Sequence, residues 1–285
     1  MTGEVARAWA QAAQAADRVG VKVVELSSAA ELTECSALLQ RVWRADHPAE
    51  VASTVILRTY AHSGNYVAGA YRGEALVGTA IGFFGRGGDA GAAGWHLHSH
   101  LAGVERGGHG QGVGFALKLH QRAWTLARGV PEVHWTYDPL IRRNAYFNLQ
   151  KLGADAAEYL PEFYDAMTDG INSGDLSDRI LVVWRLAGAR AEAAAAGRLA
   201  EADLTGAVAA VSPSPDGTEP VAHAVAAAGV RTVAVPADAE DLRLRDPGAA
   251  LRWRHAVRDA ILDGLAAGLR VTGISRDGRY LLGGA

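Results

Sequence analysis

The feature that most constrains the fold is the segment 94–118, GWHLHSHLAGVERGGHGQGVGFALK, in which a strand, a glycine-rich turn and a helix follow one another. Glycines occupy positions 107, 108, 110, 112 and 114. Successive backbone N–H groups of such a turn can converge on an anion, and the positive end of the helix dipole adds to the attraction. Taken alone, the glycines are equally consistent with a surface loop before a helix. The segment therefore predicts a pyrophosphate cradle or a plain loop.

Two familiar nucleotide motifs do not fit this turn. A Walker A loop needs Lys followed by Ser or Thr after Gly112, but Val113 and Gly114 stand there. The dinucleotide fingerprint G-x-G-x-x-G is not formed by these glycines in any register. The spacing excludes both a P-loop nucleotidase and a Rossmann dinucleotide site.

The predicted elements alternate irregularly between strands and helices. Strands are expected at 21–26, 65–71, 75–84, 95–104, 133–137, 154–164 and 179–186, and helices over 1–20, 29–44, 50–62, 113–128 and 142–152. This order predicts an α/β (α+β) fold in which helices flank a mixed central sheet, rather than a regular βαβα repeat.

The composition changes after residue 186, where alanine, glycine and proline become frequent. A helix is expected at 188–202, a turn-rich linker at VSPSPDGTEP, a strand at 230–237, a helix started by Asp246 and Pro247, and a closing hairpin. We therefore predict three parts: an N-terminal helix (1–20), a central domain (21–186) and a C-terminal α/β extension (187–285). Whether the extension caps the active site or forms a homodimer stays open.

The bulk composition narrows the class of protein. The net charge of −3 and the absence of a Lys/Arg run argue against nucleic-acid partners. Cys35 is the only cysteine, so no intramolecular disulfide can form, which fits a cytoplasmic location. No run of 18 apolar residues is present, so no membrane span is expected.

The glycine turn fits a third pattern, Q/R-x-x-G-x-G/A, with His109, Gly112 and Gly114 at its marked positions. In this respect it resembles motif A of the GNAT superfamily of acyl-CoA-dependent N-acyltransferases. The one departure is His109, which replaces the usual Arg or Gln. The preceding strand and the following helix stand where this superfamily has its fourth strand and third helix.

A second segment, RRNAYFNLQKLGA at 142–154, resembles motif B of the same superfamily, N-x-x-A-x-x-L-Y-x-x-x-G-F. The residues in register are Ala145 and Gly153. Asn144 lies two places from the usual Asn, and Leu149 stands where Tyr is usual. The element order also matches the GNAT fold over about residues 21–186. HSHLAGV and WTYDPL resemble more narrowly an uncharacterised bacterial branch that often carries a C-terminal extension.

The resemblance implies an acyl-CoA-dependent N-acetyltransferase that moves an acetyl or another short acyl group to an amine by direct attack. Acetyl-CoA, or another short acyl-CoA, would be the co-substrate, no metal is expected, and a small-molecule amine would be the acceptor. The cofactor-binding residues implied are Ala102, Gly103, Val104, His109, Gly110, Gln111, Gly112, Val113, Gly114 and Asn144. The pyrophosphate would contact the backbone of 109–114, and the pantetheine would pair with that of 102–104.

The strand before the turn carries three histidines at alternate positions, His96, His98 and His100. Alternation places them on one face of the strand. An amine must lose a proton before it attacks a thioester, and histidine is suited to accept it. In GNAT enzymes that act on arylalkylamines, two histidines of the fourth strand relay this proton, and His98 and His100 match them. We predict His100 as the base nearer the thioester and His98 as the relay.

Two other interpretations of the histidines remain. They are equally well explained as hydrogen-bonded sheet residues that line a polar cleft. They could also bind zinc, with His96 or His109 as a third ligand, although a metal site leaves the glycine turn unexplained.

The group that protonates the leaving thiolate is not fixed by the resemblance, because Leu149 replaces the usual Tyr. Tyr146, nearly one helical turn earlier, is our candidate, Tyr137 is a second, and core packing explains either equally well. Two other functions stay open: a non-catalytic acyl-CoA-binding or regulatory module, and a zinc hydrolase built on the histidine row.

Overall fold

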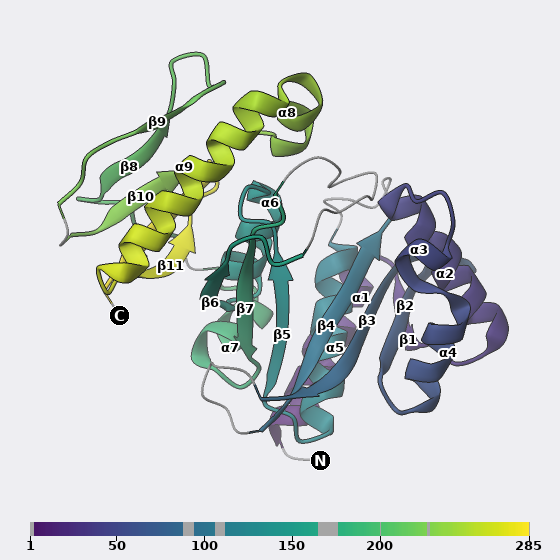
Figure 1. Cartoon of the computed structure of the whole chain (residues 1–285). Coiled ribbons are helices and arrows are strands. Elements are labelled where there is room, and N and C mark those ends of the chain that lie inside the picture. Colours follow the sequence, from purple (N-terminus) through teal and green to yellow (C-terminus); the bar gives the residue numbers. More distant parts are fainter. Residues whose placement is uncertain are drawn as a thin grey trace. The chain divides into compact units, whose positions relative to one another are not determined.

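Figure 1 shows the chain as a computed structural model. The structure describes residues 3–87, 94–105, 112–164, 176–199, 201–226 and 229–284. These residues form two compact units, and the first contains 3–135 and 185–188. The second contains the other described residues, so the boundary falls inside the strand Glu132–Tyr137. The predicted boundaries after residues 20 and 186 stay a prediction.

In the first unit, five strands lie side by side in chain order. They are β1 (Lys22–Glu25), β2 (Tyr66–Arg72), β3 (Ala75–Arg86), β4 (Trp95–Val104) and β5 (Glu132–Tyr137). Strands β1 to β4 pair antiparallel, and β5 runs parallel to β4. The helices are α1 (Gly3–Arg18), α2 (Ala29–Trp43), α3 (Ala49–Ala52), α4 (Thr54–His62) and α5 (Val113–Ala127). The predicted mixed sheet flanked by helices is confirmed.

Local sequence accounts for several boundaries in this unit. Ser28 caps α2 by accepting a hydrogen bond from the Glu31 amide, while the Glu31 carboxylate accepts one from the Ser28 amide at 2.8 Å, a capping box. Ser53 caps α4 by accepting a hydrogen bond from the Ile56 amide at 3.3 Å. This cap divides the single helix expected at 50–62 into α3 and α4. Gly73, with a φ of 61°, supplies the left-handed residue of the tight β2–β3 turn.

The two faces of the sheet in the first unit are covered by different helices. On one face, apolar residues of α2 and α4 pack on β2 and β3, with Leu32, Leu39 and Leu57 wholly buried. On the other face, a Cβ at Gly78 would lie 3.1 Å from a methyl group of Leu117 in α5. Helix α1 packs on α5 through a row of small buried residues. Figure 1 shows α1 and α5 together behind the strands.

The second unit contains a separate five-stranded sheet. It also contains β6 and β7, which belong to the seven-stranded sheet of β1 to β7. Its elements are α6 (Arg142–Tyr146), a π-turn η2 (Phe147–Lys151), β6 (Asp155–Leu160), β7 (Arg179–Arg185), α7 (Ala189–Ala195), β8 (Val208–Pro213), β9 (Pro220–Ala222), β10 (Arg231–Ala234), α8 (Ala239–Arg245), α9 (Pro247–Ala266), β11 (Arg270–Ile274) and β12 (Arg279–Gly283). β6 and β7 pair antiparallel. The sheet order is β11-β12-β10-β8-β9, in which only β8 and β10 pair parallel.

Two expectations for this unit need correction. The segment expected to be a linker is a hairpin, in which Pro213 of β8 pairs with Pro220 of β9. Prolines are tolerated there because both stand at strand ends, where a ladder N–H is dispensable. The helix expected at 142–152 is α6 followed by η2, so its hydrogen-bond pattern changes at Phe147. None of the helices within the described ranges is long and apolar enough to cross a membrane.

A buried ionic cluster holds the core of the second unit. Asp138 accepts two hydrogen bonds from Arg254 of α9, at 2.6 and 2.9 Å, and a further one from Arg243 of α8. The amide of Leu140 donates to the same carboxylate at 2.9 Å. Asp138 and Arg254 are 7% and 0% exposed, so this pair ties the segment after β5 to α9 in a setting without solvent screening.

Candidate functional site

The histidine-bearing strand β4 contains a β-bulge at His100. The register pairs Ile81 with Leu101 and Gly82 with Ser99, so His100 is the extra residue between two pairs. A bulge re-aims side chains and twists the strand. The ring of Phe83 lies 5.0 Å from that of His98 and 5.8 Å from that of His100, between centroids. The bulge thus keeps both imidazoles beside one aromatic ring on one side of the sheet.

The surroundings of these histidines favour their neutral forms. Burial, followed by the nearby His100 imidazole, lowers the pKa of His98 to about 4. Partial burial also lowers the pKa of His100. Both rings are therefore neutral at pH 7 and have a nitrogen free to accept a proton. Because the pKa of His98 is low, this imidazole does not hold a proton at neutral pH. Such a group suits a relay, which releases each proton that it accepts.

The two strands at the centre of the site pair over a short length. In the described part of the first unit, β4 pairs with β5 at Leu97–Val133 and at His98–His134. No described strand pairs with residues 99–103 on this side, whereas β3 pairs with them on the other. An open strand edge of this kind can bind an extended ligand through its backbone. Of the predicted pantetheine contacts at 102–104, Ala102 and Gly103 lie on this edge.

Two of these predicted contact residues are also held by neighbouring helices. A Cβ at Gly103 would lie 2.7 Å from the Trp43 ring of α2, so this position needs glycine for packing. The side chain of Val104 lies 3.8 Å from where a Cβ of Gly114 would stand, which places the end of β4 beside the start of α5. The strand edge and the helix start therefore adjoin.

Part of the predicted glycine turn lies outside the described residues. His109, Gly110 and Gln111 belong to that part. Gly112 has a φ of 86° and precedes Val113, the first residue of α5. None of the described side chains caps this helix. The first N–H groups of a helix without a cap can bind an anion. A Cβ at Gly112 would lie 2.9 Å from a methyl group of Val19, just after α1.

The predicted residues of motif B belong to the second unit. Asn144 of α6 is exposed, as a ligand contact must be. The Tyr146 hydroxyl donates to the Glu201 carboxylate at 3.0 Å, and this bond contributes to a raised pKa of Tyr146. Tyr137 and Leu149 are buried, and the Tyr280 hydroxyl donates to that of Tyr137. The role of Tyr146 as general acid stays a prediction, and the burial of Tyr137 favours core packing for that residue.

A buried lysine behind β4 is not indicated by any motif. The Lys118 ammonium donates to the Ser99 hydroxyl at 2.7 Å and to Gln121 at 3.0 Å, and it lies 4.0 Å from the centroid of the Trp135 ring. Burial lowers its pKa to about 7. Ser99 and the histidines alternate along the strand, so this cation stands on the opposite face from His98. Its surroundings come from β4 and β5, which the spacing of residues in α5 does not reveal.

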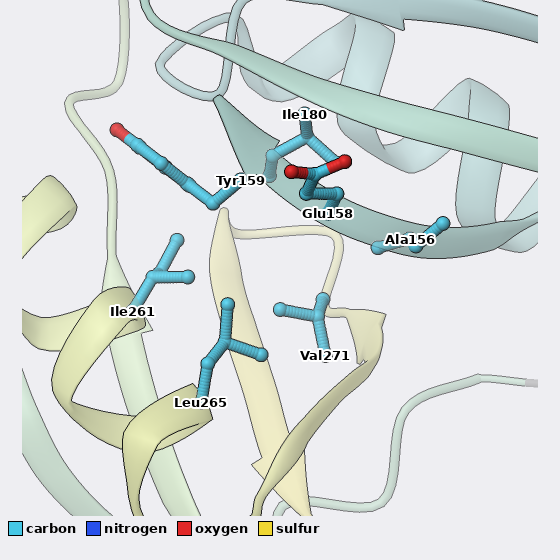
Figure 2. Close-up of a pocket in the computed structure, with 8 residues that line it drawn as sticks. Ala156, Glu158, Tyr159, Ile180, Ile261, Leu265 and Val271 are labelled. Carbon is cyan, nitrogen blue, oxygen red and sulfur yellow. The ribbon is translucent and has the colours of Figure 1, made fainter. Parts of the chain in front are cut away.

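A shallow hollow in the second unit is separate from these predicted residues. Figure 2 shows side chains from β6, β7, α9 and β11 around it. It is lined by Ala156, Ala157, Glu158, Tyr159, Ile180, Ile261, Leu265 and Val271. None of the predicted site residues lines it.

Within the described ranges, no three His, Cys, Asp or Glu side chains are arranged to hold a metal ion. His109, one of the two third ligands considered for zinc, lies outside these ranges.

Comparison with known proteins identifies similar folds. No protein-family model and no curated protein matches the chain. Among solved structures, the chain is similar to the ribosomal-protein-S18-alanine N-acetyltransferase of Escherichia coli, with 15% identity and a TM-score of 0.46 over 59% of this chain and 96% of that one. It is also similar to YncA, a putative acetyltransferase of Salmonella typhimurium solved with acetyl-CoA, with 14% identity and a TM-score of 0.47 over 59% and 95%. A third is NAA60 of Arabidopsis thaliana in complex with acetyl-CoA, with 12% identity and a TM-score of 0.46 over 59% and 99%.

Proposed function

We propose that this chain transfers an acetyl or another short acyl group from acyl-CoA to the nitrogen of a small amine. The observation that carries the proposal is the open edge of β4 beyond His98, which adjoins the uncapped start of α5 and the two neutral histidines. These three features supply a backbone edge for an extended arm, an anion site and a base in one unit.

The donor would lie along this edge. The pyrophosphate would bind the backbone of 109–114 and the first N–H groups of α5, because an anion is stabilised at a helix N-terminus. The pantetheine amides would pair with residues 102–104 as an added strand. Asn144 is the predicted polar contact to the same arm. A backbone N–H near Val104 would stabilise the oxyanion that forms when the thioester is attacked.

The chemical step follows from the charge of the amine. The protonated acceptor passes a proton to His100 and through it to His98, and the freed nitrogen lone pair attacks the thioester carbonyl carbon. The carbon–sulfur bond breaks, the acyl group stays on nitrogen, and the CoA thiolate takes a proton from Tyr146, its predicted donor. The nitrogen loses its second proton as the amide forms, and this proton restores the Tyr146 hydroxyl.

The proposal is tested by binding and by turnover. We expect acetyl-CoA to raise the melting temperature of the chain, since a ligand that binds only the folded state stabilises it. We also expect mass spectrometry to detect one acetylated product in a panel of arylalkylamines, aminoglycosides, amino acids and peptide N-termini. Binding without any product would favour a non-catalytic acyl-CoA-binding module. If neither a thermal shift nor a product appears, the proposed function is wrong.

The anion site is tested separately by Gly112→Ala. The added Cβ meets Val19 at 2.9 Å, and an L-residue at a φ of 86° costs about 1–2 kcal/mol. We expect the turn to relax and the affinity for acetyl-CoA, measured by titration calorimetry, to fall roughly tenfold. The matched control is Gly129→Ala, which follows the same helix at a φ of 72° with open space around it. Equal affinities in the two variants would show that the turn does not bind the donor.

A further inference from the structure

The inference concerns the fate of the proton and rests on the proposed function. At neutral pH the overall reaction is R–NH3⁺ + acyl-S-CoA → R–NH–acyl + HS-CoA + H⁺, so each turnover releases one proton. That proton enters the chain at His100 and His98. A bound acyl-CoA and amine would cover His100, which makes a second route to solvent useful.

The histidine row continues past the predicted base and relay. His96 and His98 are separated by one residue on β4, with no bulge between them, so they share a face. The ring of His96 stacks on that of His134 in β5, with centroids 4.1 Å apart and planes at 11°. His134 Nε2 lies 2.9 Å from the Glu132 carboxylate. The row thus crosses from β4 to β5 and ends on an acid.

We propose that His96, His134 and Glu132 form a proton exit path that carries the amine proton from His98 across the β4–β5 pair to solvent. These residues touch neither acyl donor nor acceptor in the proposed reaction and act through His98.

The spacing along the row allows proton transfer. Alternate residues on a strand are about 7 Å apart, a distance that a chain of two waters spans between two imidazoles. The parallel rings of His96 and His134 direct no N–H at each other, so the proton passes between their edges through water. His96 and His98 are both partly exposed, so water can reach them. The imidazole of His96 occupies the space above Gly85, where a Cβ would lie 2.7 Å from Nε2. Gly85 therefore leaves the room that this ring needs.

The charges around the row favour movement away from the base. Burial lowers the pKa of His98, and the nearby His100, His96, His134 and Lys118 lower it further. The pKa of His96 is lowered by burial and by His134, but the Glu132 carboxylate acts in the opposite direction. The Arg185 guanidinium lies 3.7 Å from the second oxygen of Glu132. A proton on His98 is therefore destabilised by its surroundings. Movement along the row brings it closer to the negative charge of Glu132.

The path is tested with Glu132→Gln and His134→Gln, using the amine of the panel that is acetylated fastest. In dilute buffer we expect kcat to fall about 10²-fold, the low end of what a proton-transfer group contributes, with the KM for acetyl-CoA unchanged. Added imidazole should restore kcat, because a diffusible base replaces the broken route. Gly85→Ala, which displaces the His96 ring, should behave in the same way. His62→Gln, a histidine at the end of α4, is the control and should leave kcat unchanged.

A kcat that stays at the wild-type value in dilute buffer, or that falls without recovery in imidazole, would overturn the exit path. A second measurement is independent of turnover: NMR titration of the histidine side chains of the free protein. Glu132→Gln should shift the titration of His96, whose pKa the Glu132 carboxylate raises, but not that of His120, which pairs with Tyr66 on the other side of the sheet. An unshifted His96 would also overturn the path. If the wild-type protein neither binds acetyl-CoA nor acetylates any amine, the proposed function is wrong. The NMR titration then decides by itself whether Glu132 is coupled to His96.

Discussion

Replacing His98 and His100 together by glutamine is expected to lower kcat for amine acetylation by a factor of about 10² to 10⁴, the range that general acid–base catalysis contributes. Both imidazoles lie beside Phe83 on one side of β4, and their neutral forms are favoured by burial. Glutamine keeps a polar side chain of similar size but cannot accept and pass on a proton at neutral pH. The measurements are kcat by mass spectrometry and the acetyl-CoA dissociation constant by calorimetry, which should stay unchanged.

The pH dependence of the acetylation rate is a second test of the proton relay. A histidine with a lowered pKa is neutral, and able to accept a proton, at every pH above that value. Because the pKa of His98 is about 4, protonation of this relay should not limit the wild-type rate between pH 6 and 9. The rate should instead rise with pH as more of the acceptor amine is deprotonated. A double variant with wild-type kcat over this range would refute the proton-relay role.

Replacing Asp138 by asparagine is expected to lower the free energy of unfolding by about 3–5 kcal/mol at pH 7, the cost of removing one partner from a buried ion pair. The Arg254 and Arg243 guanidinium groups would then stay buried without their carboxylate. Urea unfolding monitored by circular dichroism measures the change. The matched control is Glu219→Gln, which removes an exposed carboxylate from Arg252 of α9 and should leave the free energy of unfolding nearly unchanged, because solvent screens this pair.

The pH dependence of this stabilisation has a defined sign. The two arginines hold the pKa of Asp138 well below its usual value despite burial. A carboxyl whose pKa is lowered in the folded state contributes stability above its unfolded pKa of about 3.9 and loses it as the pH falls toward the folded value. The difference between wild type and Asp138→Asn should therefore narrow below about pH 4. A difference that is small at pH 7, or independent of pH, would contradict this account of the cluster.

The elements that local patterns specify were predictable. The cap at Ser28, the helix start at Asp246 and Pro247 and the strand at Trp95–Val104 depend on residues close together in the chain. The turn residue Gly73 likewise identifies the β2–β3 hairpin. The mixed sheet follows from the order of such elements.

What could not be predicted depends on pairing between distant segments. The bulge at His100 is a property of the register between β3 and β4, and a strand pattern of β4 alone does not contain it. The stack of His96 on His134 requires the parallel alignment of β4 with β5. The hairpin at Pro213 was missed because its prolines are typical of linkers, whereas at strand ends they break no ladder bond.

The packing of α1 on α5 bears on how this chain folds while it is being synthesised. The buried Arg122 of α5 donates to Gln11 of α1 at 2.8 Å and to the carbonyl of Leu186 at 2.8 Å. One guanidinium thus joins the N-terminal helix to a segment that is translated long after β5 is complete. Because domains fold as units when their last part has emerged, the first unit should stay open on the ribosome until residue 186 is released.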